Sequence, residues 1–272
     1  MENQVQFNTW KEDVEGITPQ QQIDCLRIVE LNISNICNLK CPFCPHSKDW
    51  QPTKPLLMDF LTVEKVTQQL KEINYQGYIC IAGMGEPTFH PNILQIIDLL
   101  KDFKVVLVSN GTLLKSSVWN EITNKCQIKI SVHDWSKIDV FKDKFKDTNA
   151  WFRNHDTINP QMNLYNRGGY LWKPQTKIIR MCNFPFYKIF IDTNGDYLRC
   201  EADWSHKSRR QYNINNTSIK DYFVNALEED RTLMLKPSGR QNFDSCKTCD
   251  IQGTLTGQKF INFWKENNAK SK

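Results

Sequence analysis

The sequence predicts an α/β fold built on a parallel sheet, followed by a smaller β-hairpin unit. From Cys25 to about Lys173, short apolar runs alternate with longer amphipathic stretches, which is the pattern of consecutive strand–helix–strand units. After Lys173, two short apolar runs flank Asn194-Gly195, a dipeptide that favours a tight hairpin turn. The length of 272 residues suits one large domain, or a main domain with a small appendage.

Five strands are predicted in the first part of the chain, each from a short run of apolar residues. They are Leu26–Ile33, Tyr78–Ala82, Lys104–Ser109, Ile128–Val132 and a weaker one at Met162–Tyr165. Four helices alternate with them: the first has apolar residues at helical spacing, and the second opens on a proline, which suits a first turn. These helices are Asp59–Ile73, Pro91–Lys101, Leu113–Lys125 and Lys137–Phe145, and a further helix is expected near Ile219–Leu227.

The predicted elements divide the chain into four parts. A polar leader covers residues 1–24, the main domain 25–175, the hairpin unit 176–252 and a polar tail 253–272. We expect the leader to lie outside the main core, because it is polar and contains Gly16 and Pro19.

Composition and charge exclude several classes of protein. The 35 Lys and Arg residues against 30 Asp and Glu give a formal charge of +5, which is too mild and too dispersed to indicate a nucleic-acid partner. The N-terminus lacks a signal-peptide pattern, and no apolar run reaches membrane-spanning length, so we expect a soluble cytoplasmic protein without a membrane partner. Ten cysteines in such a chain favour metal or redox chemistry over a disulfide framework.

Three of these cysteines follow the first predicted strand closely. Cys37, Cys41 and Cys44 have the spacing CxxxCxxC, and three thiolates on one loop can hold three irons of a [4Fe–4S] cluster, leaving the fourth iron open to a small ligand. Zinc is the alternative, with His46 as a possible fourth ligand. A structural zinc site usually takes four ligands from two pairs, so the cluster is the favoured interpretation.

With Phe43 before the last cysteine, the triplet resembles the CxxxCx(aromatic)C signature of the radical S-adenosylmethionine (SAM) superfamily, which follows the first strand of a partial (β/α)6 barrel. Gly83-Met-Gly85-Glu86-Pro87, after the second predicted strand, resembles the glycine-rich GGEP segment of that family. The resemblance implies that the open iron binds the amine and carboxylate of SAM, and that an electron cleaves SAM to methionine and a 5′-deoxyadenosyl radical. It also implies that Gly85 and Glu86 bind SAM, with Glu86 receiving the methionyl ammonium.

Polar residues after the third and fourth predicted strands occupy places where members of this family contact the SAM ribose and carboxylate. They are Ser109 and Asn110 after the third strand, and Ser131 and His133 after the fourth. Each is also a common residue of an ordinary turn or cap.

A second cysteine set lies in and after the hairpin unit. The hairpin turn brings Cys182 toward Cys200, and the pair Cys246 and Cys249 completes four thiols, which taken alone would favour a zinc ribbon. After the first motif, the pattern CX(9–15)GX4C followed by CxxC resembles the twitch region, a shortened SPASM domain. That resemblance implies an auxiliary [4Fe–4S] cluster with four cysteine ligands, whose natural role is to move electrons.

The remaining cysteines and histidines fit neither set. We interpret Cys25, Cys80 and Cys126 as small buried hydrophobes. A lone histidine is more often structural than catalytic; of His133 and His155, we keep His133 as a candidate catalytic residue.

Within the twitch group, the chain is most similar to the 2-deoxy-scyllo-inosamine dehydrogenases over roughly Leu26–Asp250, including the segment Asn166-Arg167-Gly168-Gly169. Arg167 would face the space between the clusters, where a guanidinium can bind a polar substrate or the SAM carboxylate. The implied reaction is the oxidation of an alcohol, with the auxiliary cluster as electron acceptor and a reductant such as flavodoxin or ferredoxin.

Three hypotheses of function remain open from the sequence. The first is a radical SAM dehydrogenase of a polar alcohol such as an amino sugar or cyclitol. The second is a peptide-modifying maturase, which usually carries a winged-helix element that the 24-residue leader is too short to form. The third is a non-enzymatic zinc-binding protein. We expect Met84 and the segment Glu201–Trp204 to select the substrate.

Overall fold

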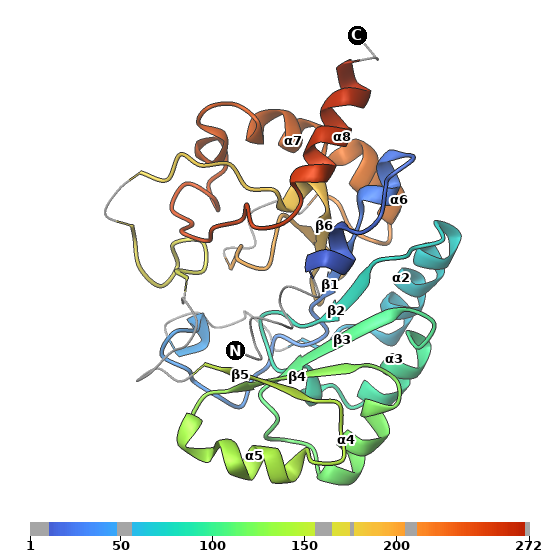
Figure 1. Cartoon of the computed structure of the whole chain (residues 1–272), viewed down its shortest axis with the longest axis vertical. Helices are drawn as coiled ribbons and strands as arrows, with labels where there is room; N and C mark the ends of the chain where they lie inside the picture. The colour runs from blue at the N-terminus through green and yellow to red at the C-terminus, as the bar shows by residue number, and fades with distance from the viewer. Residues whose placement is uncertain (1–10, 48–55, 156–164, 175–176, 205–210, 270–272) are drawn as a thin grey trace.

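A computed structural model describes residues 11–47, 56–155, 165–174, 177–204 and 211–269. Its centre is a seven-stranded sheet in the order β5-β4-β3-β2-β1-β6-β7 (Figure 1). The strands are β1 (Ile28–Leu31), β2 (Tyr78–Ile81), β3 (Lys104–Ser109), β4 (Gln127–Val132), β5 (Trp151–Asn154), β6 (Lys188–Ile191) and β7 (Tyr197–Leu198). All neighbouring pairs are parallel except β6 and β7, and the fold is the α/β, barrel-like one predicted from the sequence.

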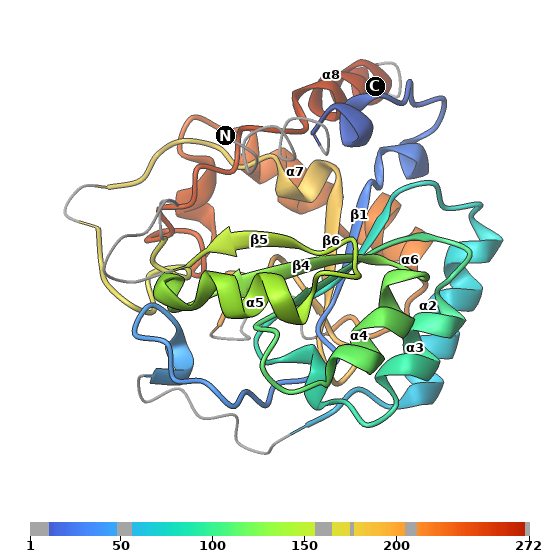
Figure 2. The ribbon, with the colours of Figure 1, turned by 60° about the horizontal axis from the view of Figure 1, so that its bottom comes forward.

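Helices follow the strands and lie along one side of the sheet (Figures 1 and 2). Asp59 caps the first of them by accepting a hydrogen bond from the Leu61 backbone N–H at 3.1 Å. No helix of the described residues is long and apolar enough to cross a membrane. The helices on the sheet are α2 (Phe60–Glu72), α3 (Ile93–Leu99), α4 (Ser116–Thr123) and α5 (Ile138–Lys144).

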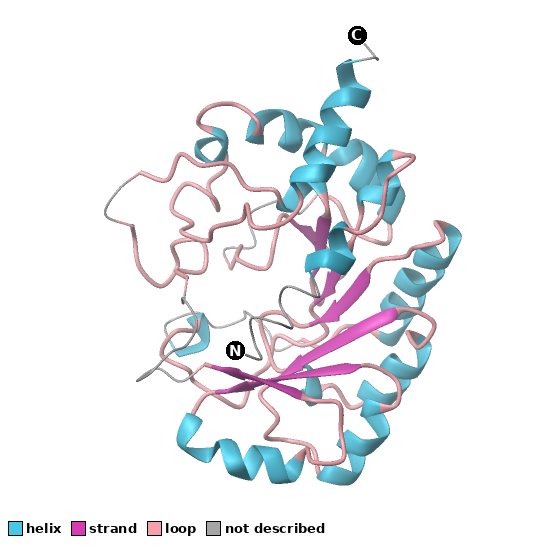
Figure 3. Ribbon diagram, in the orientation of Figure 1, coloured by secondary structure: helices cyan, strands magenta, loops and turns pink. Residues whose placement is uncertain are grey.

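The C-terminal part adds short helices at the β6 end of the sheet (Figure 3). They are α6 (Ile219–Asp221), which continues into a π-helical turn at Tyr222–Ala226, then α7 (Glu228–Met234) and α8 (Gln258–Ala269). Short 3-10 turns occur at Gln22–Cys25, Pro45–Ser47, Pro87–Phe89, Trp135–Lys137, Phe184–Phe186 and Gly239–Asn242.

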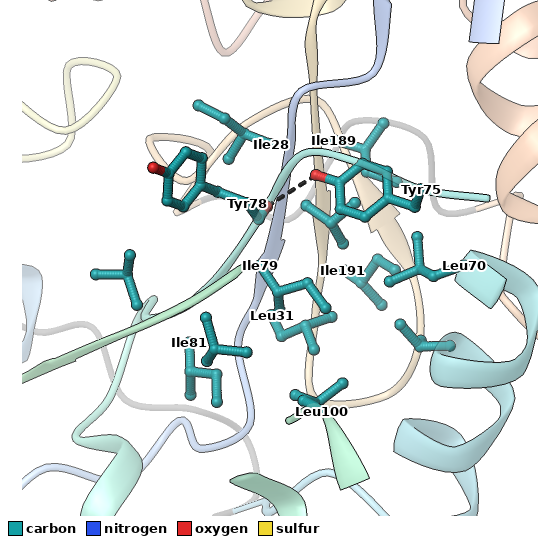
Figure 4. Close-up of a cluster of buried hydrophobic side chains, with 14 of the residues drawn as sticks. Ile28, Leu31, Leu70, Tyr75, Tyr78, Ile79, Ile81, Leu100, Ile189 and Ile191 are labelled. Atoms are coloured by element: carbon teal, nitrogen blue, oxygen red, sulfur yellow. Dashed lines mark hydrogen bonds between the residues drawn. The ribbon is translucent and has the colours of Figure 1, made fainter. Parts of the chain in front are cut away.

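The two faces of the sheet differ in chemistry because successive side chains of a strand point to opposite faces. The helix-facing side chains form apolar rows across the strands, and several of them are fully buried (Figure 4). One such row is Leu31, Ile81 and Leu107, which are in register on β1, β2 and β3. The opposite face carries polar side chains such as Glu30 on β1 and Lys129 on β4, which line a cavity.

The predicted hairpin extends this sheet. β6 pairs in parallel with β1, with Glu30 opposite Phe190, and β7 pairs antiparallel to β6, with Leu198 opposite Phe190. Because β7 runs back along β6, Cys200 comes level with the start of β6, near Lys188. The hairpin therefore brings a cysteine of the second set beside the polar face of the main sheet.

The structure corrects three predictions. The fifth strand is Trp151–Asn154, whereas Met162–Leu164 of the predicted strand lie outside the described residues. The described part of the leader packs on the core: Val14 is fully buried because Asp13 beside it accepts hydrogen bonds from the side chains of Tyr78 and Lys104. Within the predicted tail, α8 forms because its aromatic side chains bury themselves, with the rings of Trp264 and Phe186 5.7 Å apart.

The apolar row across the strands predicts a large cost for Leu31→Ala. Leu31 is fully buried, so truncating it removes buried methyl groups and leaves a cavity, lowering the free energy of unfolding by about 2–5 kcal/mol. The matched control is Leu61→Ala on α2, where the side chain is 68% exposed and the change should stay within about 0.5 kcal/mol. Urea unfolding followed by circular dichroism measures both; equal effects would contradict the assignment of this face as the core.

Candidate active site

A cavity of about 340 Å³ lies on the polar face of the sheet, a volume typical of a small-molecule site. Side chains from all five strands β1 to β5 line it together with the loops that follow these strands. In parallel α/β sheets, ligands bind where such loops gather. All the residues predicted to hold SAM or the first cluster line this cavity, namely Cys37, Cys41, Cys44, Gly85, Glu86, Ser109, Asn110 and Ser131.

The loop after β1 presents three free thiols to the cavity. Burial raises the pKa of Cys37 to about 11 and that of Cys41 to about 12, and for Cys41 the neighbouring Cys44 and Cys37 add to the rise. Binding a metal would deprotonate these thiols, since thiolate is the ligand form. Half-buried free thiols on one short loop are a donor set that suits iron and sulfide.

The loop after β2 holds the cysteine loop in place through the backbone. The Glu86 N–H donates to the Ile36 carbonyl at 2.7 Å, one residue before Cys37. Gly85 allows this approach, because a Cβ there would lie 2.3 Å from the Ser34 carbonyl oxygen. A ring nitrogen of His46 lies 2.6 Å from the Met84 carbonyl oxygen, which ties the far end of the cysteine loop to the same segment.

The Glu86 carboxylate joins this segment to β3. Its Oε1 accepts hydrogen bonds from the Ser109 hydroxyl at 2.7 Å and from both the hydroxyl and the N–H of Thr88, while Oε2 accepts from the Asn110 N–H at 2.8 Å. The Asn110 amide also donates to Asn38, the residue after Cys37, at 2.9 Å. The structure thus brings together residues from three separate loops, while the role of Glu86 toward the methionyl ammonium stays a prediction.

An aromatic and histidine cluster closes the cavity beyond β4 and β5. Phe43 stacks on His133 with ring centroids 5.5 Å apart, and its edge meets His155 at 5.6 Å. Burial, aided by the charge of Arg153, lowers the pKa of His133 to about 4 and that of His155 further. Both imidazoles are therefore neutral near pH 7. The Arg153 guanidinium donates to the Ser131 hydroxyl at 2.8 Å.

Sequence reasoning missed a buried ionic triad on the opposite wall. The Lys188 ammonium contacts Glu30 at 2.6 Å and Glu201 at 2.9 Å. Although burial opposes it, the two carboxylates raise the pKa of Lys188 well above its usual value, so the lysine stays charged. Glu30 and Lys188 are charged residues within otherwise apolar strands, which is the signal that the sequence offered. Only the pairing of β1 with β6 brings the two charges together.

Arg167 lines the cavity on a left-handed turn with φ of +51°, and its role toward a substrate or SAM stays a prediction. Its guanidinium stacks on the Tyr165 ring, 4.4 Å from the centroid, and donates to the Tyr165 hydroxyl. The preceding Asn166, which the prediction did not single out, is fully buried. Its amide donates to the Thr248 carbonyl at 2.6 Å, so the turn that carries Arg167 is fastened between Cys246 and Cys249.

The four thiols of the second set are free, and three of them are buried; Cys200 is half-buried. Burial raises the pKa of Cys200 well above its usual value, and the nearby charges of Glu201, Cys246, Cys249 and Cys182 raise it further. These thiols therefore lie close enough to interact. Within the described residues, no group of three or more His, Cys, Asp or Glu side chains is arranged so that it could hold a metal ion.

A buried arginine supports the second cysteine set. Arg240 is 1% exposed and donates to the backbone carbonyls of Cys249 at 2.9 Å and Gln252 at 3.1 Å. Gly253 packs against Cys182, where a Cβ would lie 2.6 Å from Sγ. Arg240 and Gly253 thus connect the segments that carry Cys182 and Cys249, and four thiols are a ligand set that suits an iron–sulfur cluster or zinc.

One expectation about the remaining cysteines is wrong. Cys25 and Cys126 are buried in the apolar core, but Cys80 is half-buried and lines the cavity. The reason is the strand period: Ile79 and Ile81 face the helices, which turns Cys80 to the polar face.

Comparison with known proteins agrees with this fold. Residues 31–158 match the model of the family described as the Radical SAM superfamily, and this part of the chain is a radical SAM domain. BtrN, a 2-deoxy-scyllo-inosamine dehydrogenase, in complex with AdoMet and 2-DOIA has a similar structure. The TM-score is 0.74 at 21% identity, over 86% of this chain and 96% of BtrN.

Other matches are more distant or shorter. Native anSMEcpe with bound AdoMet and Kp18Cys peptide has a TM-score of 0.55 at 16% identity, over 90% of this chain and 99% of that one. At these identities the similarity of both structures concerns the fold. In sequence, the chain is 28% identical over 113 residues to a GTPase Obg of Brachyspira hyodysenteriae, covering 39% of this chain and 16% of that protein.

A second curated relative is the tungsten-containing aldehyde ferredoxin oxidoreductase cofactor-modifying protein of Pyrococcus furiosus. It is 27% identical over 99 residues, which are 36% of this chain and 27% of that protein. The chain thus spans less than a third of the length of either curated relative.

The ionic triad predicts a large loss of stability for Lys188→Met. Removing the ammonium leaves Glu30 and Glu201 facing each other in a buried wall, which should cost about 3–5 kcal/mol of unfolding free energy. Lys71→Met is the control, because its ion pair with Asp102 is exposed and should contribute less than about 1 kcal/mol. If urea unfolding gave the same small change for both variants, the triad would not hold the wall together.

Proposed function

We propose that this protein is a radical SAM oxidoreductase that dehydrogenates a polar alcohol such as an amino sugar or cyclitol. The observation that carries the proposal is that the cavity is lined both by the first thiol set and by the neighbour of a thiol of the second set. Cys37, Cys41 and Cys44 line it, and so does Glu201, the residue directly after Cys200. An electron released in the cavity would therefore have a short path to an auxiliary cluster on the second set.

The cofactors would be held by separate parts of the chain. Cys37, Cys41 and Cys44 would bind the [4Fe–4S] cluster that takes SAM, and Cys182, Cys200, Cys246 and Cys249 would bind the auxiliary [4Fe–4S] cluster. When bound, SAM and these clusters supply a 5′-deoxyadenosyl radical that removes a hydrogen atom and an acceptor for one electron. The rest of the chemistry is positioning and exclusion of water by the protein.

Contacts between the two sets support a shared site. Trp204, in the segment after Cys200, packs in one apolar cluster with Met84, and Cys44 packs against this cluster. Phe43, His133 and His155 pack together around the first cysteine loop, which keeps water from the reacting atoms. Arg167 would orient a hydroxyl or amine of the substrate, because its stacked guanidinium is already fixed on Tyr165.

The proposal is tested by anaerobic reconstitution with iron, sulfide, SAM and dithionite. Each assay contains 2-deoxy-scyllo-inosamine, glucosamine or myo-inositol deuterated at its carbinol carbons, and a peptide panel forms a further arm. Deuterium in 5′-deoxyadenosine together with a carbonyl product two hydrogens lighter supports alcohol dehydrogenation. Deuterium-free 5′-deoxyadenosine with every alcohol, and modification of a peptide, would assign the protein to the maturases instead.

The electron-acceptor role predicts a specific defect in Cys246→Ala. This variant should still cleave SAM, because the first cysteine set is intact, but it should not complete the oxidation. Cys126→Ala is the control, since Cys126 is buried in the core away from both sets and should leave the product yield unchanged. A wild-type yield of carbonyl product from Cys246→Ala would remove the auxiliary cluster from the reaction.

A further inference from the structure

Oxidation of an alcohol requires an acceptor for the hydroxyl proton as well as acceptors for the hydrogen atom and the electron. A base does this best when its pKa lies near the working pH and it is in reach of the hydroxyl. The cavity walls contain three carboxylates, three histidines, a tyrosine and a lysine outside the metal-ligand sets, so the candidates can be compared one by one. Of the histidines, His46 is already engaged through a ring nitrogen with the Met84 carbonyl oxygen at 2.6 Å.

The carboxylates are already engaged. Glu86 accepts four hydrogen bonds from Thr88, Ser109 and Asn110, so its carboxylate oxygens are already occupied. Glu30 and Glu201 both contact the ammonium of Lys188, so proton uptake by either would break a buried ion pair.

The remaining side chains on the wall beyond β4 are poor acceptors at neutral pH. The pKa of His133 falls to about 4 through burial, and the pKa of His155 falls further for the same reason. The pKa of Tyr165 rises to about 12 through burial, so its hydroxyl keeps its proton.

Lys129 differs from all of these groups. It points into the cavity from the middle of β4, two residues before Ser131, and its Nζ lies 4.3 Å above the centre of the Trp151 ring. In the part of the chain that the structure describes, no carboxylate forms an ion pair with it. An amine that is enclosed and unpaired in this way has a free lone pair available when it is neutral.

Resting on the proposed function, we propose that Lys129 is the base that accepts the proton of the substrate hydroxyl. In the holoenzyme, SAM would supply the group that takes the hydrogen atom from the carbinol carbon, and the four later cysteines would hold the acceptor for the remaining electron. The Lys129 amine would take the hydroxyl proton and become an ammonium. The carbon–oxygen bond becomes a carbonyl, so the alcohol loses two hydrogens and the charges balance.

The surroundings of Lys129 suit this role. Burial lowers its pKa to about 7, and the charge of Arg153 on β5 and, more weakly, that of Lys188 on β6 act in the same direction. Cys80 on β2 and Glu30 on β1 oppose this shift. The amine is therefore neutral above about pH 7 and protonated below it, so product formation should rise with pH through this range.

The test compares Lys129→Met and Lys129→Arg with the wild-type holoenzyme, using the deuterated alcohols of the screen. We expect both variants to release methionine from SAM but to form the carbonyl product at least about 100-fold more slowly, with the rise in rate near pH 7 absent. Arginine keeps the charge without being a base, so it should not rescue. Lys71→Met, on the outer surface, should behave as wild type.

A second measurement reads the lysine directly. Trace labelling of the wild-type holoenzyme with acetic anhydride, followed by mass spectrometry, should show Lys129 reacting with a midpoint near pH 7. An ordinary lysine midpoint at Lys129, or a rise in KM with unchanged kcat and pH profile in Lys129→Met, overturns the base role. A wild-type enzyme that cleaves SAM and oxidises no alcohol overturns the proposed function and this role together.

Discussion

The parallel pairing of β6 with β1 is the contact on which the arrangement of the site depends. It joins a segment near residue 190 to the first strand of the radical SAM domain, and it continues the apolar face of the sheet through Ile189 and Ile191. On the other face, it sets Lys188 between Glu30 and Glu201. Without this pairing, the second cysteine set would have no fixed relation to the cavity.

The same pairing explains why the cavity wall is polar. A sheet covered by helices on one face can carry charges on the other only where they are paired or reach a ligand. Here one wall is closed by the Lys188 triad, while Lys129 on β4 and Arg167 beyond β5 are left to face the cavity contents. The cavity on this face is thus lined by charged side chains.

The sequence predicts features that depend on neighbouring residues and misses those that depend on contacts between distant segments. The first four strands and both cysteine sets were predicted because apolar runs and Cys spacing are local patterns. β5 was missed because Trp151–Asn154 is short and mixes aromatic with charged residues. The Lys188 triad, the buried Asn166 and the inward turn of Cys80 arise from pairing between segments far apart in the chain, and one sequence does not reveal such pairing.

The proposed function requires that the chain hold two iron–sulfur clusters, one on each thiol set. The most direct test is to count iron and sulfide in reconstituted wild-type protein and in two variants, each of which lacks one thiol set. The wild type should hold about eight irons and eight sulfides per chain. About four of each should remain in a first variant with Cys37, Cys41 and Cys44 changed to alanine, and in a second variant with the four later cysteines changed to alanine. SAM cleavage should survive only in the second variant. Zinc without sulfide, or about four irons in the wild type, would contradict the account.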